Sequence, residues 1–344
     1  MGLRVLLAGA ASAALTLCAA AGASTFSGVV VIGDSIVDSG NANAGSILAG
    51  TPTPTPAPPY FQGRFSNGFN YADLISLELT GSPATALLET TSPVDLQTNY
   101  AVGGAGASLD PYQGIGVPDS VPDLAEQVSL YINGGLITGI PVPSGLDTDA
   151  LHIINIGGND FIAAAAGIQD IPTLINNASV AVDAALLELV GAGANNILIS
   201  NVTSLVAGRG ATPADQAALA ASVAAYNAFL ESRIATINAT NPGANVNLFD
   251  VDALTLAIVD DLPRFGFDPA FFGQACIESA AALALDCAGY TDFDGVHPTA
   301  AVHRIYAQAA LDTLGISSQP VPVPGALPLM AGGLVLMWRR RQKA

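Results

Sequence analysis

Short runs of apolar, often β-branched residues recur along the chain, and most of them stop at glycine or a polar residue. A run that is apolar at successive positions predicts a strand covered on both faces, as in a parallel sheet. Such runs lie at residues 29–32, 99–102, 151–156, 196–200 and 246–251.

Segments with a helical spacing of apolar residues lie between these strands. They cover residues 71–79, 124–132, 171–190, 213–237, 253–259 and 299–314. Strands and helices therefore alternate about five times, which predicts an α/β fold with a parallel sheet and helices on both faces. No internal repeat is visible, and we expect residues 24–318 to form one domain.

A Thr-Pro repeat at residues 51–59 interrupts this alternation. Alternating Thr and Pro favours an extended polyproline conformation and excludes a helix. Because the repeat follows the first strand closely, we interpret it as a surface loop near the end of that strand.

The first 23 residues have a different pattern, in which Arg4 precedes an apolar stretch that ends in small residues. This pattern predicts a secretory signal peptide over residues 1–23, cleaved by signal peptidase after Ala23. A core helix would show a polar face, which this stretch lacks. Cys18 follows Leu17, which is too bulky for a convincing lipoprotein signal.

At the other end, residues 319–344 contain a Pro-rich motif, an uncharged apolar stretch and a cluster of arginines. Apolar residues followed by basic ones predict a membrane anchor with cytoplasmic positive charge. The tail resembles the VPEP/VPLPA-type (PEP-CTERM) sorting signals of Gram-negative bacteria. The resemblance implies a transient anchor through the C-terminal helix, an exosortase-like processing enzyme, and export to the cell surface or the medium.

Charge restricts the partners of the region between the two ends. All 28 acidic residues lie there, against five basic ones, Arg64, Arg209, Arg233, Arg264 and Arg304. So acidic a surface argues against nucleic-acid binding, which requires clustered Lys and Arg.

Cys276 and Cys287 are the only cysteines beyond the signal peptide. In an exported chain, two cysteines eleven positions apart predict a disulfide that closes a loop. Such a bridge contributes ~3 kcal/mol in the chain-entropy model.

Three predicted strands end in glycine and a polar group, at residues 33–35, 103–104 and 157–159. The carboxyl ends of parallel strands meet at one edge of the sheet. That edge would carry a serine hydroxyl, exposed backbone N–H groups and an asparagine amide, which are the parts that ester hydrolysis requires. Taken alone, residues 33–35 are equally compatible with an ordinary strand-to-loop exit.

A serine nucleophile requires a base, and the chain has three histidines. His152 lies inside an apolar strand and His303 on the last helix, so we interpret both as structural. His297 lies three residues after Asp294, which could orient one ring nitrogen while the other faces Ser35. The same spacing also occurs in a simple Asp-Gly turn with a capping histidine.

Five segments resemble, in order, the successive blocks of the GDSL/SGNH lipases and esterases. They are residues 33–36 (GDSI), 63–68 (GRFSNG), 99–105 (NYAVGGA), 156–160 (IGGND) and 294–299 (DGVHPT). Together they span nearly the whole body of the chain. The resemblance implies an SGNH hydrolase fold: a flavodoxin-like, three-layer α/β/α sandwich with a central, mostly parallel sheet of about five strands.

By this resemblance Ser35 is the nucleophile, His297 the base and Asp294 its orienting partner. The backbone N–H groups of Ser35 and Gly104 and the side chain of Asn159 form the oxyanion hole. The family implies no cofactor.

Three details qualify the match. Gly104 is preferred to Gly103 by counting from Asn99, and Ile36 stands where relatives have Leu. Phe293 stands where many relatives have Trp. The G-x-S-x-G elbow, the phosphate-binding glycine patterns and a metal-type Cys/His cluster do not occur in the sequence.

The leading hypothesis is a secreted serine ester hydrolase that acts on a small-molecule or lipid ester. Acyl transfer to an alcohol by the same residues is one alternative, and an inactive surface or matrix protein of the same fold is another. Four aromatic residues are equally compatible with an acyl pocket and with the core: Phe265, Phe267, Phe271 and Phe272.

Overall fold

The computed structural model describes residues 26–89, 98–108, 121–137, 139–168 and 170–316. The predicted signal peptide (1–23) and the predicted sorting tail (319–344) lie outside the described residues.

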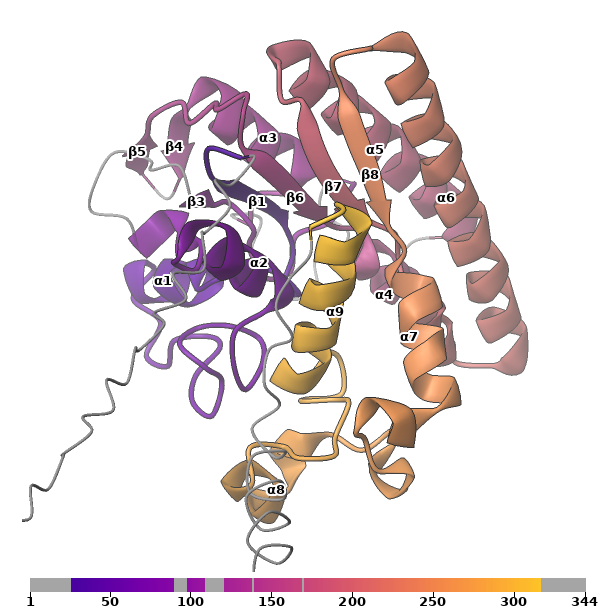
Figure 1. The fold of residues 1–344 in the computed structure, drawn as a ribbon. Coiled ribbons are helices and arrows are strands. Elements are labelled where there is room, and N and C mark those ends of the chain that lie inside the picture. The colour runs from indigo at the N-terminus through magenta and orange to yellow at the C-terminus, as the bar shows by residue number, and fades with distance from the viewer. Residues whose placement is uncertain (1–25, 90–97, 109–120, 138, 169, 317–344) are drawn as a thin grey trace, which may run out of the picture.

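A six-stranded sheet forms the centre of the molecule, with the strand order β2-β3-β1-β6-β7-β8 and every pair parallel (Figure 1). The strands are β1 (Val29–Gly33), β2 (Thr85–Ala86), β3 (Thr98–Asn99), β6 (Leu151–Asn155), β7 (Asn196–Ser200) and β8 (Asn245–Phe249). A two-stranded antiparallel pair, β4 (Gly135–Ile137) and β5 (Ile140–Val142), stands apart from it.

Helices cover both faces of the sheet, which confirms the three-layer α/β/α fold (Figure 1). One face carries α3 (Leu124–Asn133), α4 (Gly158–Ala165), α5 (Ile171–Ala192) and α6 (Pro213–Thr240). The other carries α2 (Tyr71–Thr80), α7 (Val251–Asp260) and α9 (Ala300–Thr313). Successive side chains of a strand point to opposite faces, so Val30 and Ile32 enter the first core and Val29 and Val31 the second.

Local signals in the sequence define several helix ends. Helix α2 begins with a capping box between Asn70 and Asp73, and α6 begins with one between Thr212 and Asp215. Each box satisfies N–H groups that the first turn of a helix leaves unpaired. Helix α2 ends at Gly81, whose φ of 87° is accessible to glycine at little cost.

The structure adds elements that periodicity did not predict. The sheet has six strands where about five were expected, because the two-residue strand β2 is too short to show a pattern. Helix α1 (Asn41–Leu48) is mostly polar or small, and α4 begins directly in a glycine turn. Helix α1 therefore lacks the apolar stripe by which a helix is detected in a sequence. Helix α4 has an apolar face, with Phe161, Ala163 and Ala164 buried, but its eight residues are too few to show a clear period.

Among the described residues, only α5 is long and apolar enough to cross a membrane by length and composition. In this structure one side of α5, with Leu174, Val182, Leu186 and Leu189, is buried in the core, whereas Val180 and Leu187 are exposed. The predicted C-terminal anchor is a different segment, to which this observation does not apply.

Candidate active site

Ser35 lies in a tight turn directly after β1. The backbones of β1 and β6 approach so closely at Gly33 that a Cβ atom there would lie 2.2 Å from the Asn155 carbonyl oxygen. The buried side chain of Gln127 also holds Gly33, accepting its N–H at 2.8 Å and donating to its carbonyl at 2.9 Å. The glycine therefore places Ser35 at the carboxyl edge of the sheet.

His297 connects Ser35 to Asp294. Its Nε2 lies 2.7 Å from Ser35 Oγ, and its Nδ1 lies 2.7 Å from Asp294 Oδ2. The other carboxylate oxygen accepts the backbone N–H groups of Val296 and His297, both at 2.9 Å. Gly295, at a φ of 93°, allows the loop to fold back in this way.

The environment of Asp294 favours its ionised form. Burial raises the pKa of this carboxyl, but hydrogen bonding and charge from His297 outweigh burial and lower the pKa to about 2. A permanent carboxylate beside Nδ1 stabilises positive charge on the ring, as the acid of a Ser-His-Asp chain does.

Residues 63–68 pack between the histidine loop and the turn at Gly103. The Phe65 ring packs on the His297 ring with centroids 5.0 Å apart. Ser66 Oγ donates to the Pro298 carbonyl at 2.8 Å. A Cβ atom at Gly103 would lie 2.4 Å from the Phe65 ring, so this glycine is required for the same packing.

The predicted oxyanion-hole residues lie at the same edge of the sheet. Asn159, near the start of α4, lines the same cavity as Ser35 and donates to the Ala105 carbonyl at 2.7 Å. Gly104, at a φ of 94°, follows Val102, whose N–H donates to the Gly33 carbonyl at 3.1 Å. The turn that contains Gly104 therefore adjoins the serine turn.

Asp38 is a structural residue of the site that the sequence did not reveal. It is fully buried, and its carboxylate accepts the N–H groups of Gly40, Asn41, Ala42 and Gly103. Burial raises the pKa of Asp38 to about 6. Because the Gly103 N–H is used here, Gly104 is the better candidate for the oxyanion donor.

Asp34, the neighbour of Ser35, makes the contacts of a turn residue. Its Oδ1 accepts from Ile36 N at 3.0 Å and from Asn155 Nδ2 at 3.2 Å. Burial raises the pKa of Asp34 to about 7. These contacts are structural, because they hold the turn to the end of β6.

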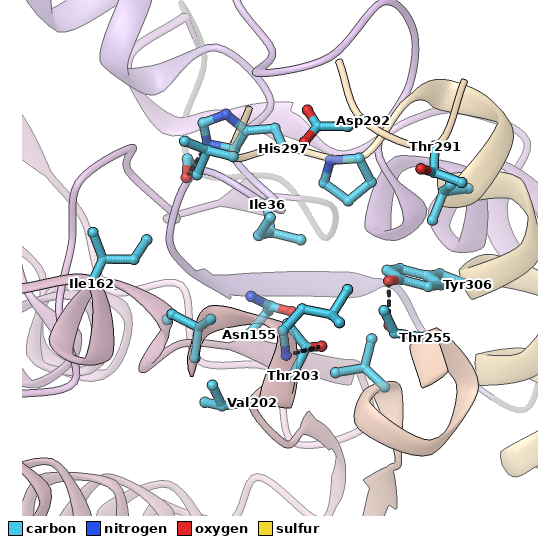
Figure 2. Close-up of a pocket in the computed structure, with 18 of the residues that line it drawn as sticks. Ile36, Asn155, Ile162, Val202, Thr203, Thr255, Thr291, Asp292, His297 and Tyr306 are labelled. Atoms are coloured by element: carbon cyan, nitrogen blue, oxygen red, sulfur yellow. Dashed lines mark hydrogen bonds between the residues drawn. The ribbon is translucent and has the colours of Figure 1, made fainter. Parts of the chain in front are cut away.

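An apolar cavity of about 540 Å³ opens beside Ser35 and His297 (Figure 2). Figure 2 shows Ile36, Ile162 and Val202 around it, and at one side the hydroxyls of Thr255 and Tyr306 bond to each other at 2.6 Å. Of the four phenylalanines in doubt, only Phe272 lines this cavity. The other three pack elsewhere: Phe265 and Phe267 with the second core, Phe271 against Tyr290.

The remaining two histidines lie away from Ser35. His152 is buried between the Tyr131 hydroxyl at 2.7 Å and the Asn196 carbonyl at 3.0 Å. His303 is buried against the Tyr71 N–H, and burial lowers its pKa to about 3. Neither residue lines the cavity at Ser35.

Tyr60 is a neighbour of Asp294 that sequence reasoning missed. Its hydroxyl donates to Asp294 Oδ2 at 2.8 Å across a sequence separation of 234 residues. Its ring packs edge-on against Phe293 with centroids 5.1 Å apart. Its only visible signal is its position after the Thr-Pro segment (51–59), which was expected to lie near the site.

Behind the histidine loop, Cys276 and Cys287 lie at disulfide distance, with Cα atoms 5.6 Å apart. They pack with Tyr290 and the fully buried Phe293. The part of the chain that the structure describes contains no group of three or more His, Cys, Asp or Glu side chains arranged for a metal ion.

Residues 29–310 match the family described as GDSL-like Lipase/Acylhydrolase. The chain belongs to this family. The match covers most of the chain and confirms the resemblance carried by the five sequence blocks. As a GDSL-like lipase/acylhydrolase, the chain is an ester-hydrolysing enzyme.

Curated relatives span most of the chain at low identity. The Thermolabile hemolysin of Vibrio parahaemolyticus serotype O3:K6 is 26% identical over 304 residues, which are 83% of this chain and 63% of that protein. The GDSL esterase/lipase At4g28780 of Arabidopsis thaliana is 26% identical over 328 residues, 81% of this chain and 84% of that protein.

Among solved structures, a catalytic mutant of Axe2, an acetylxylan esterase from Geobacillus stearothermophilus, is 14% identical. It aligns over 85% of this chain and 96% of its own, with a TM-score of 0.42.

Proposed function

We propose that this GDSL-like enzyme is an exported serine ester hydrolase in which Ser35 is the nucleophile, His297 the base and Asp294 the orienting acid. The observation that carries the proposal is the continuous contact from Ser35 Oγ through His297 to Asp294, with both hydrogen bonds at 2.7 Å. Neither of the other two histidines reaches a serine beside a cavity.

The geometry supports an acyl-enzyme mechanism. Ser35 Oγ attacks the ester carbonyl carbon while its proton passes to His297 Nε2, and Asp294 stabilises the resulting imidazolium. The carbonyl oxygen becomes an oxyanion, for which Ser35 N–H, Gly104 N–H and the Asn159 amide are the proposed donors. When the C–O bond breaks, the alcohol leaves with the proton from Nε2.

The second half of the reaction uses water in place of the alcohol. His297 takes a proton from water, whose oxygen attacks the acyl carbon. The acid then leaves, and Ser35 Oγ recovers its proton. If an alcohol enters instead of water, the same steps transfer the acyl group, and product analysis with an added alcohol distinguishes the two outcomes.

The cavity supports a small-molecule or lipid ester as substrate. Its lining is dominated by aliphatic side chains such as Ile36, Ile162 and Val202, and burying an acyl chain there is favourable by about 0.8 kcal/mol per CH₂. A panel of esters with increasing acyl length would show where the cavity is filled. No cofactor enters this scheme.

The test of the function is Ser35→Ala. The exchange removes only the Oγ atom, so we expect kcat/KM for a p-nitrophenyl ester to fall by at least ~10⁴-fold while the protein stays folded. Labelling by a fluorophosphonate probe should disappear as well. Ser232→Ala, at an exposed position of α6, is the matched control and should retain both signals.

Retained labelling or turnover in Ser35→Ala would exclude Ser35 as the nucleophile. A wild-type protein that neither turns over esters nor labels would favour the inactive surface or matrix protein.

Export is part of the proposal through the two ends of the chain. The signal peptide (1–23) and the tail (319–344) support secretion, transient anchoring and processing by signal peptidase and an exosortase-like enzyme. A disulfide between Cys276 and Cys287 fits an oxidising compartment. Mass spectrometry of the mature protein would identify both termini and the bridge.

A further inference from the structure

The Asp294 carboxylate accepts four hydrogen bonds, and one of them comes from outside its own loop. Oδ1 accepts the N–H groups of Val296 and His297. Oδ2 accepts from His297 Nδ1 at 2.7 Å and from the Tyr60 hydroxyl at 2.8 Å. A carboxylate offers about four lone-pair positions. All of them are therefore in use, and the tyrosine shares one oxygen with the imidazole.

Tyr60 reaches Asp294 from the side away from the substrate cavity. Tyr60 lines a second cavity near the Thr-Pro segment (51–59). It is not one of the described residues that line the cavity at Ser35. Its edge-on contact with the buried Phe293 orients the ring. The hydroxyl is thus held on Asp294 without access to the substrate.

We propose that Tyr60 is a positioning residue that disperses the negative charge which Asp294 presents to His297, and thereby sets the pH at which His297 begins to act as a base. This inference rests on the proposed function, in which His297 is the base for Ser35. Burial and the adjacent Asp294 raise the pKa of Tyr60, so its hydroxyl keeps its proton and remains a donor.

The direction of the effect follows from the shared oxygen. A hydrogen bond to a carboxylate stabilises its negative charge. Without the Tyr60 hydroxyl, Oδ2 carries more negative charge and attracts a protonated His297 ring more strongly. A protonated ring cannot accept the Ser35 proton, so the acidic limb of activity should move upward.

The other titratable groups that face this pair do not depend on Tyr60. Asp292 lies on the histidine loop, and Arg209 from the segment before α6 contacts the same loop. His303 faces His297 from α9, and because burial lowers its pKa to about 3 it is neutral near pH 7. Asp34, beside Ser35, lines the same cavity as His297, and burial raises its pKa to about 7, but its carboxylate is bonded to Ile36 and Asn155. None of these groups hydrogen-bonds to the Tyr60 hydroxyl.

The experiment compares the full-length wild type with Tyr60→Phe, which removes the hydroxyl and keeps the ring contacts. The pH profile of kcat/KM is measured for p-nitrophenyl butyrate, with the product quantified by chromatography. We expect the acidic limb to move upward by about half a pH unit or more, while the plateau stays within about threefold. The low-field proton resonance of the His297–Asp294 bond should shift as well.

Tyr290→Phe is the matched control, because Tyr290 belongs to the same aromatic cluster and stacks on Phe271. Its profile should coincide with that of the wild type. The inference would be overturned if the acidic limb of Tyr60→Phe did not move, or if Tyr290→Phe shifted by the same amount. If turnover still depended on Ser35 in that case, the proposed function would remain intact. A wild type without Ser35-dependent turnover would overturn both.

Discussion

At the scale of single residues, the site depends on close backbone approaches and buried polar contacts. Gly33 brings β1 against the Asn155 carbonyl, and Gln127 bonds both backbone groups of that glycine. The buried carboxylate of Asp38 accepts hydrogen bonds from four backbone N–H groups that belong to two segments of the chain. These residues contact no substrate in the proposed mechanism, yet they determine where Ser35 and Gly104 lie.

The close approach at Gly33 predicts a large effect of Gly33→Ala. The new Cβ would lie 2.2 Å from a backbone oxygen and 2.9 Å from Val37, so strands β1 and β6 must separate. We expect the free energy of unfolding to fall by roughly 2–4 kcal/mol. Urea unfolding followed by circular dichroism measures this free energy of unfolding.

Gly191→Ala is the control for this substitution. Gly191 lies within α5, and a Cβ atom there meets no heavy atom within 4 Å. Alanine should stabilise the helix by about 0.5–1 kcal/mol. Equal stability changes for the two variants would show that the close approach at Gly33 is not a constraint.

At the scale of elements, the segment between the two cysteines supports the histidine loop from behind. Cys276 N–H donates to the Asp292 carbonyl at 3.0 Å, and Ile277 N–H donates to the Phe293 carbonyl at 2.8 Å. The loop with Asp294 therefore pairs with the start of the cysteine segment. A change in that segment reaches the site through these two hydrogen bonds.

Replacing both Cys276 and Cys287 by Ala tests this support. Loop closure predicts a loss of about 3 kcal/mol in unfolding free energy. Because the segment also holds Asp292 and Phe293, we expect a several-fold loss of kcat/KM at temperatures well below unfolding. Treating the wild type with a reductant should reproduce both effects.

A variant that loses stability without losing activity would show that the histidine loop holds its position without the bridge. The variant without the two cysteines, treated with the same reductant, serves as the reference because it has no bridge to reduce and should not change further.

At the scale of the whole molecule, charge is the dominant feature beyond the fold. The body carries 28 acidic residues against five arginines. Two of those arginines pair with carboxylates, Arg64 with the buried Asp73 at 2.6 Å and Arg233 with Asp183 at 2.6 Å. The surface is therefore strongly acidic, and mutual repulsion of its charges opposes the compact state.

Salt should stabilise the protein at neutral pH. Raising NaCl from about 0.02 M to about 0.5 M shortens the Debye length to a few ångströms and screens this repulsion. We expect Tm, measured by calorimetry, to rise by several degrees. An unchanged or lower Tm would indicate that attractive ion pairs dominate the surface electrostatics.

The sequence alone determined the fold class and predicted most of the chemistry that is proposed. Apolar runs and helical spacing located the buried strands and long helices, because burial on a sheet or helix face imposes a period on the sequence. The order of the five blocks led to the GDSL/SGNH family, which the family match confirms. The roles of Ser35, His297 and Asp294 were read from those blocks and remain part of the proposed function.

Only the tertiary structure decided which distant groups meet. Tyr60 and Asp294 are 234 positions apart, and Gln127 and Gly33 are 94 apart, and neither pair leaves a period or motif in the sequence. Short elements such as β2 and α1 also cannot be recognised in the sequence, because two strand residues or one polar helix show no hydrophobic pattern. Periodicity reports which side of an element is buried, whereas contacts between elements depend on how the whole chain packs.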